Sequence, residues 1–432
     1  PLGDHLGAGP RMTELIRHTE LENGLRVVTE QLPALRSAAI GFWVGTGSRD
    51  ETDELHGASH FLEHLLFKGS EKRLAHEIAE AIESIGGDMN AFTTQEMTAF
   101  YVRVPDAELE LAVDILSDIF WAPAIREDEV ESERHVILEE INMRDDTPDD
   151  LVHELLAQAL WNGHPVGREV IGTTESVTGM ARETIAGYHH MHYEPRNVVV
   201  AAAGNLEHQQ VVDLVSARVP AGLGAHADRL HGQTGVPARP LTVMTRMTEQ
   251  AHLVLGMRAF SRHDPDRFAL TVLNTALGGG MSSRLFQEVR EKRGLAYSVY
   301  SYRIAFDDTG ALAVYAGTSP GRVDEVLGVI DAELARLVNE GGISARELDA
   351  AKGHLKGSMA LSLESSTSRM NRIGSSELTM REILSLDEIV QGVDAVTSEA
   401  VARVVDRVVA QGERSLAVIG PIDESAFTAR VA

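Results

Sequence analysis

The sequence predicts a mixed α/β protein built from two similar domains. The chain has 432 residues, which is more than one ordinary hydrophobic core holds. Strand-like apolar runs are separated by segments with apolar residues at helical spacing. The same order of segments starts again after a stretch rich in Gly, Pro and His. We therefore expect a first domain at residues 1–220, a linker at 221–240 and a second domain at 241–432.

The first domain contains a regular series of predicted elements. Alternating or continuous apolar runs predict strands at residues 24–32, 37–49, 97–105 and 196–205. Apolar residues at i, i+3 and i+4 predict helices at residues 57–68, 74–85, 106–121 and 127–144.

Two segments of the second domain resemble segments of the first. Residues 250–262 resemble residues 37–49, and residues 310–337 resemble the strand and helix that span 97–121. A helix is expected at residues 264–277, soon after the first of these segments. The repetition indicates a duplicated domain of roughly 200 residues.

The duplication singles out one short sequence, His-Phe-Leu-Glu-His at residues 60–64. Matching Arg49 to Arg262 gives an offset of 213 residues between the two copies. The residues that then match His60, Glu63 and His64 are Leu273, Ala276 and Leu277. Since the second copy has plain apolar residues there, the fold does not require the two imidazoles and the carboxylate. This favours a chemical role for them.

His60 and His64 are spaced to bind one metal ion. Positions i and i+4 lie on the same face of a helix, so both imidazoles can reach the same ion. Glu63 lies on the neighbouring edge, where it could take a proton from a water beside the metal. The chain has no cysteine, so a metal must be held by histidine and carboxylate ligands, as suits Zn²⁺. The order of the motif is that of the inverted zinc peptidases. The alternative is a partly buried histidine pair that only fills space.

A third ligand is expected from the helix at residues 127–144. Val130, Ile137 and Ile141 define its buried face, and Glu139 points nearly opposite, into solvent. The remaining carboxylates that border the buried face are Glu133 and Glu140. Helical geometry leaves both of them open as ligands. We take Glu140 as the ligand and Glu133 as a group that supports a histidine or the metal.

With these residues the sequence resembles a known family, the pitrilysin or M16 metallopeptidases. The motif "HFLEH", with a glutamate in "VILEE" 76 positions after His64, matches the first signature of that family. The segment "RLFQEVREKRGLAYSVYS" matches the second signature, which contains Arg290 and Tyr297. The resemblance covers nearly the whole chain and is closest to bacterial members akin to the β subunit of the mitochondrial processing peptidase. It implies an α+β fold of two similar domains, each a mixed, largely antiparallel sheet covered by helices.

The resemblance also implies a role for each residue of the first signature. His60, His64 and Glu140 would bind Zn²⁺, and Glu63 would be the general base. The activity implied is that of a zinc endopeptidase acting on extended peptides or unfolded polypeptide segments.

Further residues are implied to hold the substrate. Arg290 and Tyr297 would bind it and polarise its carbonyl group. Asn90, Ala91 and Phe92 would belong to an edge strand to which the substrate adds as a further strand. Two-domain relatives work as dimers in which the Arg-Tyr pair reaches the zinc of the facing half, so we expect a homodimer. Pairing with an inactive partner chain is the alternative.

The charge of the chain suggests which substrates it attracts. There are 39 basic and 65 acidic residues, a net charge of −26, so nucleic acid would be repelled and basic polypeptides attracted. The acidity could also serve only to keep the protein in solution. The stretch at residues 144–154 is acidic and is expected to be a solvated loop. The related mitochondrial enzyme prefers arginine near its cleavage site and uses carboxylates in this region, so the resemblance implies Asp150 and Glu154 as candidates for binding a basic side chain. Phe67 either lines the pocket at the scissile bond or belongs to the core.

The remaining expectations concern location and alternative functions. No run approaches 18 apolar residues, and the N-terminus lacks the pattern of a secretory signal, so no membrane span and a cytoplasmic location are expected. Met12 could be the natural start. The sequence leaves two other functions to consider: a non-catalytic assembly subunit, and a processing peptidase dedicated to one precursor. Both zinc and Arg-Tyr signatures are intact, which argues against the first.

Overall fold

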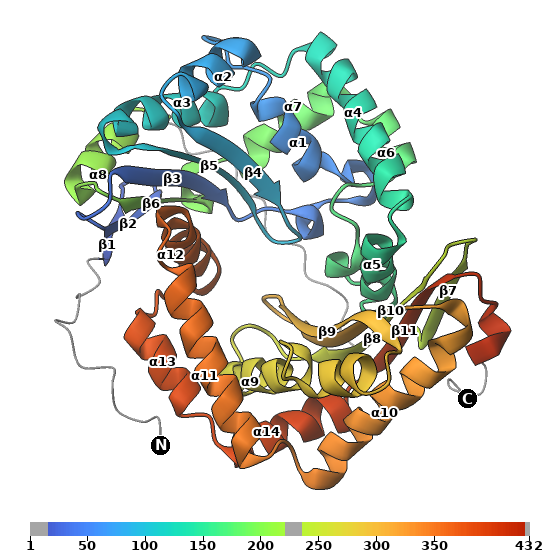
Figure 1. Cartoon of the computed structure of the whole chain (residues 1–432). Helices are drawn as coiled ribbons and strands as arrows, with labels where there is room; N and C mark the ends of the chain where they lie inside the picture. Colours follow the sequence, from blue (N-terminus) through green and yellow to red (C-terminus); the bar gives the residue numbers. More distant parts are fainter. Residues whose placement is uncertain (1–15, 221–235, 428–432) are drawn as a thin grey trace.

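The chain folds into two halves, each formed by one sheet and its helices (Figure 1). The structure, a computed structural model, describes residues 16–220 and 236–427. Met12 and most of the predicted linker at 221–240 lie outside this range. None of the helices in these residues is long and apolar enough to cross a membrane.

The first sheet has six strands in the order β1-β2-β6-β3-β5-β4. Neighbouring strands are antiparallel except for β2 and β6, which are parallel. Their bounds are β1 Ile16–Glu20, β2 Arg26–Gln31, β3 Ser37–Val44, β4 Asp88–Thr93, β5 Thr98–Pro105 and β6 Val198–Gly204. Strand β4 is therefore the last strand of this sheet.

The second sheet repeats the arrangement with five strands in the order β7-β11-β8-β10-β9. Only β7 and β11 are parallel. The bounds are β7 Leu241–Thr245, β8 Ala251–Ala259, β9 Ala296–Ala305, β10 Gly310–Thr318 and β11 Arg414–Gly420. The expected fold of two mixed, largely antiparallel sheets covered by helices is confirmed.

Eight α-helices belong to the first half of the described chain and six to the second. The first set is α1 Ala58–Leu66, α2 Ala75–Glu83, α3 Leu109–Trp121, α4 Glu127–Asp145, α5 Pro148–Leu160, α6 Thr174–Gly179, α7 Arg182–His192 and α8 His208–Ser216. The second set is α9 Arg267–Gly278, α10 Val323–Glu340, α11 Ala345–Ser362, α12 Ser366–Met380, α13 Leu386–Asp394 and α14 Ser398–Val404. Helix α9 takes the place in the second half that α1 takes in the first, as the repeat predicts, and Leu273 and Leu277 are fully buried in it.

The two halves exchange one helix each (Figure 1). Helix α12 of the second half packs on the first sheet, where Met370 and Ile373 join Trp43 in one apolar cluster. Gly374 permits this close approach, since a Cβ atom there would lie 2.7 Å from the Trp43 ring.

Helix α5 of the first half covers the second sheet in return. Leu151, Val152 and Leu156 pack against Val254 and Tyr315. Each sheet therefore buries one of its faces with a helix from the other half. Removing either half would expose this apolar surface to water, which is unfavourable.

A buried cluster of charged side chains also joins the halves. Arg49 pairs with Glu96 of its own half and with Asp308 of the other, at 2.9 Å between Nη2 and Oδ2. Arg262, the counterpart of Arg49 in the repeat, pairs across the halves with Glu96. Arg49 is fully buried and Glu96 is 2% exposed. Because these charges are removed from water, each depends on its partners.

We predict that Arg49→Met destabilises the protein strongly. The substitution removes one partner of a buried ion pair and leaves carboxylates uncompensated, which typically costs about 3–5 kcal/mol of the free energy of unfolding. Urea unfolding of the purified protein measures this as a lower transition midpoint. Arg36→Met is the matched control, because the Arg36 side chain is 88% exposed where it meets Asp106. Equal midpoints for the two variants would show that the buried cluster does not hold the halves together.

Candidate metal centre

Helix α1 carries the His-x-x-Glu-His motif, and its ends and its buried face are fixed by local chemistry. Gly57 precedes it with a φ of +95°, a conformation that favours glycine. The two oxygens of the buried Glu51 carboxylate accept the backbone amides of Gly57 and Ser59 at 2.7 and 2.8 Å. Phe61 and Leu65 are buried in the core. The flank of the helix that carries His60, Glu63 and His64 is consequently held at the margin of the core.

Helix α4 presents its carboxylates to that flank. Val130, Ile137 and Ile141 are buried, and Glu139 is exposed, as the helical periodicity predicts. Glu133 is 3% exposed, whereas Glu140 is partly exposed. The two carboxylates left open by the sequence therefore have different surroundings.

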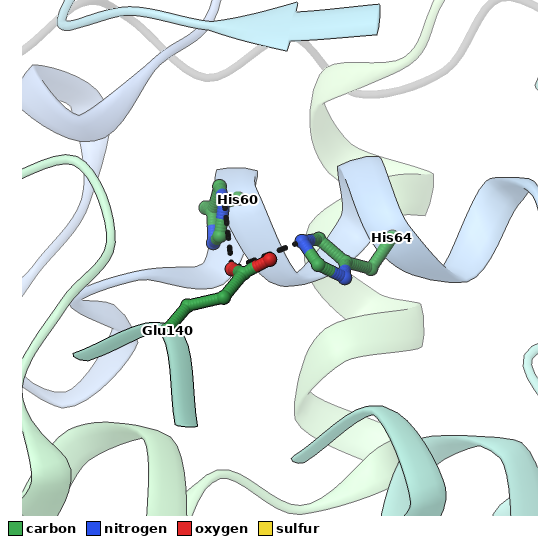
Figure 2. Close-up of side chains that lie close together, drawn as sticks. All are labelled: His60, His64 and Glu140. Atoms are coloured by element: carbon green, nitrogen blue, oxygen red, sulfur yellow. Dashed lines mark ion pairs between the residues drawn. The ribbon is translucent and has the colours of Figure 1, made fainter. Parts of the chain in front are cut away.

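His60, His64 and Glu140 converge on one point (Figure 2). The Oε2 atom of Glu140 lies 3.7 Å from Nε2 of His60 and 3.4 Å from Nε2 of His64. In a tetrahedral zinc site, bond lengths near 2.0–2.1 Å place neighbouring ligand atoms about 3.3–3.5 Å apart. The donor set and its spacing therefore fit a zinc ion. Within residues 16–220 and 236–427, these three residues form the only such group of histidine and acidic side chains.

Glu133 supports His64 from the side opposite Glu140. Its Oε2 atom lies 3.1 Å from Nδ1 of His64, and its Oε1 atom lies 2.6 Å from the ammonium group of Lys68. A carboxylate that accepts the Nδ1 proton leaves the Nε2 lone pair free to face a metal. By contrast, Nδ1 of His60 is buried and has no hydrogen-bond partner among the described residues.

Burial sets the protonation of the site. Desolvation, with a smaller contribution from His64, lowers the pKa of His60 to about 4, so this imidazole is neutral at pH 7 and can act as a ligand. Burial also raises the pKa of Glu63, and the nearby Glu140 adds to this effect. A hydrogen bond from Thr93 and the proximity of His64 act in the opposite direction. Glu63 is thus a carboxyl group of raised basicity beside the ligand group.

The Glu63 side chain is held by a residue that sequence reasoning did not identify. The hydroxyl of Thr93 donates to Oε2 of Glu63 at 2.5 Å. Thr93 is the last residue of β4. The only available signal was strand alternation, which puts Thr93 on the same face as Ala91.

Asn90, Ala91 and Phe92 lie in β4, at the edge of the first sheet. The amide of Ala91 donates to the Oδ1 atom of Asn90 at 2.8 Å. Phe92 packs with Tyr101 on the face covered by α12. Phe67 packs against the first core with its ring centroid 5.9 Å from that of Phe100.

Arg290 and Tyr297 lie together in the second half, at a helical turn and at the start of β9. An Nη atom of Arg290 donates to the Tyr297 carbonyl oxygen at 3.0 Å, and its guanidinium lies 4.5 Å from the centroid of the tyrosine ring. Tyr297 is 77% exposed. In the described chain, neither side chain has a hydrogen bond or ion pair with His60, Glu63, His64 or Glu140.

The expectation that residues 144–154 form a solvated loop is wrong for most of the stretch. Pro148 begins helix α5, which continues to Leu160 and carries both Asp150 and Glu154. Proline is favoured in the first turn of a helix, and the apolar residues of α5 pack on the second sheet.

Glu154 lines a cavity of about 410 Å³ between α5 and the second sheet. Its carboxylate lies 3.4 Å from Arg144. Burial, opposed by Arg144, raises the pKa of Glu154 to about 7. Other residues that line this cavity are His153, Trp161, Glu169, Tyr300 and Phe306. Asp150 is exposed on the same helix.

Comparison with known families covers both halves of the chain. Residues 26–174 match the model of insulinase, peptidase family M16, and residues 179–355 match that of the peptidase M16 inactive domain. The chain belongs to the peptidase M16 family. The name of the second model agrees with the apolar residues that α9 has at the positions of the motif.

Relatives and solved structures agree with this assignment. An uncharacterised zinc protease of Streptomyces coelicolor is 47% identical over 95% of this chain and 90% of its own length. One from Bacillus subtilis is 41% identical over 94% of this chain and 98% of its own. The crystal structure of a protease from Helicobacter pylori has the same fold, with a TM-score of 0.89 and 24% identity over 94% of this chain and all of that chain. The cofactor of this M16 protein is therefore zinc.

Proposed function

We propose that this M16 protein is a zinc endopeptidase that hydrolyses extended peptides or unfolded polypeptide segments. His60, His64 and Glu140 hold the ion, Glu133 orients His64, and Glu63 is the general base. The observation that carries the proposal is the convergence of two imidazole nitrogens and one carboxylate oxygen at zinc-ligand spacing, with a further carboxylate of raised pKa beside them. An assembly subunit without activity would not need this set of groups.

The chain's own residues account for the proton transfers. When bound, zinc supplies positive charge that makes a neighbouring water more acidic and stabilises charge on the substrate carbonyl oxygen. Glu63 takes the proton of the attacking water as general base and returns it to the leaving amine as general acid. Its raised pKa suits both directions of this transfer.

Strand β4 is the proposed docking edge for the substrate backbone. As the last strand of its sheet, it leaves one edge without a partner strand in the described chain. An extended peptide can add there through main-chain hydrogen bonds with Asn90, Ala91 and Phe92. Because such pairing needs an extended chain, folded proteins should resist cleavage. Phe67 remains a weaker candidate for the wall of the pocket, since it packs in the core.

The Arg-Tyr pair completes the site from a second subunit in this proposal. Tyr297 is exposed, Arg290 lies over its ring, and in the described residues neither makes a hydrogen bond or ion pair with the candidate metal ligands of its own chain. In a homodimer, the phenol could donate a hydrogen bond to the oxyanion formed at the partner's zinc, as in other oxyanion sites. Arg290 would hold the substrate backbone.

Basic peptides are the proposed preferred substrates. The net charge of −26 attracts cationic chains over long range. Glu154 and Glu169 offer carboxylates at a cavity with aromatic walls that could receive a cationic side chain. Asp150, one turn before Glu154 on α5, is exposed and could contact the same basic substrate outside the cavity.

The first prediction from this proposal distinguishes the role of a metal ligand from the role of the general base. Glu140→Gln should lose most of its zinc on dialysis, because a neutral amide is a poorer zinc ligand than a carboxylate. Glu63→Gln should keep one zinc per chain and lower kcat/KM about 10²- to 10⁴-fold, because the proton acceptor is gone. Atomic absorption and peptide cleavage measure the two effects. Glu139→Gln is the control, since this exposed residue lies next to Glu140. Near-normal turnover of Glu63→Gln would remove the general-base assignment.

The second prediction concerns substrate charge. Basic peptides should be cut faster than matched acidic peptides, and this preference should weaken as salt is added. It should also increase between pH 6 and pH 8, since Glu154 with a pKa of about 7 gains its negative charge across this range. Glu154→Gln should abolish the pH dependence of the preference for basic peptides. Glu139→Gln removes one carboxylate elsewhere on the surface, and this variant should keep the pH dependence. Equal rates on both peptides would contradict the proposed preference.

The third prediction tests the shared site by complementation. His60→Ala and Tyr297→Phe proteins should each be nearly inactive. When they are mixed in equal amounts and allowed to exchange subunits, about a quarter of the sites should be intact, since half of the dimers are mixed and each has one complete site. A mixture of His60→Ala and His64→Ala proteins should recover nothing, because both lesions affect the same part of every site. If exchange is verified by mass-tagged subunits and no activity returns in the first mixture, the sites are not shared between subunits.

A further inference from the structure

Thr93 connects the edge strand of the first sheet to the Glu63 carboxylate. Its hydroxyl lies 2.5 Å from Oε2 of Glu63, and no other hydrogen bond to this carboxylate occurs in the part of the chain that the structure describes. Glu63 is only partly exposed, so water competes weakly for this oxygen. A hydrogen bond to an ionised carboxylate is short and strong when it is shielded in this way.

We propose that Thr93 is a positioning residue of the peptidase reaction, which holds the Glu63 carboxylate at the angle needed for proton transfer. The proposal rests on the proposed role of Glu63 as the base. The terminal torsion of a glutamate side chain is soft, so without a fixed donor the carboxylate samples a broad range of angles. A donor on one oxygen narrows this range and leaves the other oxygen, Oε1, to accept the proton.

The place of Thr93 in the sheet gives this bond a second consequence. Thr93 ends β4, directly after Asn90, Ala91 and Phe92, where the substrate backbone is proposed to add. The strand that sets the register of the peptide therefore also sets the angle of the base. A misplacement of about 1 Å between reacting groups can lower a rate by about 100-fold, so a common anchor for substrate and base is valuable.

The backbone around Thr93 is rigid enough for this role. Thr93 pairs with Thr98 across the β4–β5 hairpin. The turn that follows is closed by the hydrogen bond from the amide of Thr94 to the carbonyl of Met97 at 2.8 Å. Glu96 within that turn is fixed by its ion pairs with Arg49 and Arg262.

The test compares Thr93→Val with Thr93→Ser in the full-length zinc-loaded protein. Valine has the same shape and a high strand propensity but no donor, whereas serine keeps the donor. We expect Thr93→Val to lower kcat roughly 10- to 100-fold, as is typical for loss of a hydrogen bond to a charged group, with KM unchanged within about twofold. Thr93→Ser should recover most of kcat. Zinc affinity, measured by competition with a chromophoric chelator, should stay within twofold of the original protein for both. Thr242→Val, in strand β7 of the other half, is the control for loss of a strand threonine.

The outcomes distinguish this inference from the proposed function. If Glu63→Gln is inactive but Thr93→Val keeps kcat within threefold, the positioning role is overturned and the general base stands. If Thr93→Val raises KM or weakens zinc binding and Thr93→Ser does not restore kcat, Thr93 serves only the structure, and the inference is also overturned. If Glu63→Gln itself is active, the base assignment fails, and the role of Thr93 fails with it.

Discussion

The buried ion pairs of Arg49 with Glu96 and Asp308 fix the position of the candidate site as well as the contact between the halves. Glu96 lies in the turn that follows strand β4, and Arg49 lies in the segment that leads to helix α1. The backbone repeats this connection, because the amide of Arg49 donates to the carbonyl of Gln95 at 2.9 Å. The end of β4 and the start of the motif-bearing helix are thereby joined by both side-chain and backbone contacts. Since Thr93 of β4 and Glu63 of α1 are hydrogen-bonded to each other, the geometry of the Glu63 carboxylate depends on a charge cluster that lies outside the site.

The two halves use the same architecture for different purposes. Strands β4 and β9 are the equivalent edge strands of the two sheets, and helices α1 and α9 are equivalent helices. In the first half, the edge strand and the helix together carry the candidate site. In the second half, the helix has only apolar residues at the matching positions, and the second residue of the edge strand is the exposed Tyr297. An exposed aromatic side chain with a cation stacked on it is typical of a recognition surface rather than of a core. The duplication therefore places the candidate metal ligands in one half and the exposed Arg-Tyr pair in the other.

The sequence was sufficient for the local elements and for the candidate ligands, but not for the way the elements pack. The spacing of His60 and His64 and the periodicity of helix α4 predicted three ligand candidates on two helix faces, because a helical face is a local property. The structure brings these three side chains together. Periodicity did not decide between Glu133 and Glu140, since both border the buried stripe. Only the position of α1 determines which of the two carboxylates lies beside which histidine nitrogen.

Periodicity also did not reveal the helix exchange: an apolar stripe indicates that a helix is buried, but not which sheet covers it. In α5 the acidic residues obscured the spacing of Leu151, Val152, Leu155 and Leu156, which is that of a helix packed on a sheet. The partners of Arg49 lie 47 and 259 residues away, and local pattern cannot choose them among so many carboxylates.

The two candidate histidine ligands differ in how they are prepared for a metal. His64 has its Nδ1 atom against Glu133, whose charge is in turn balanced by Lys68 at the end of α1. The ring orientation of His64 is therefore set before any ion binds, and little conformational freedom is lost on binding. His60 has no such partner for its Nδ1 atom in the described chain, and burial keeps it neutral instead. One imidazole is thus positioned by a hydrogen bond, while the other is positioned by packing and kept neutral by burial. The two imidazoles are therefore directed toward Glu140 by different local means, a hydrogen bond for His64 and burial for His60.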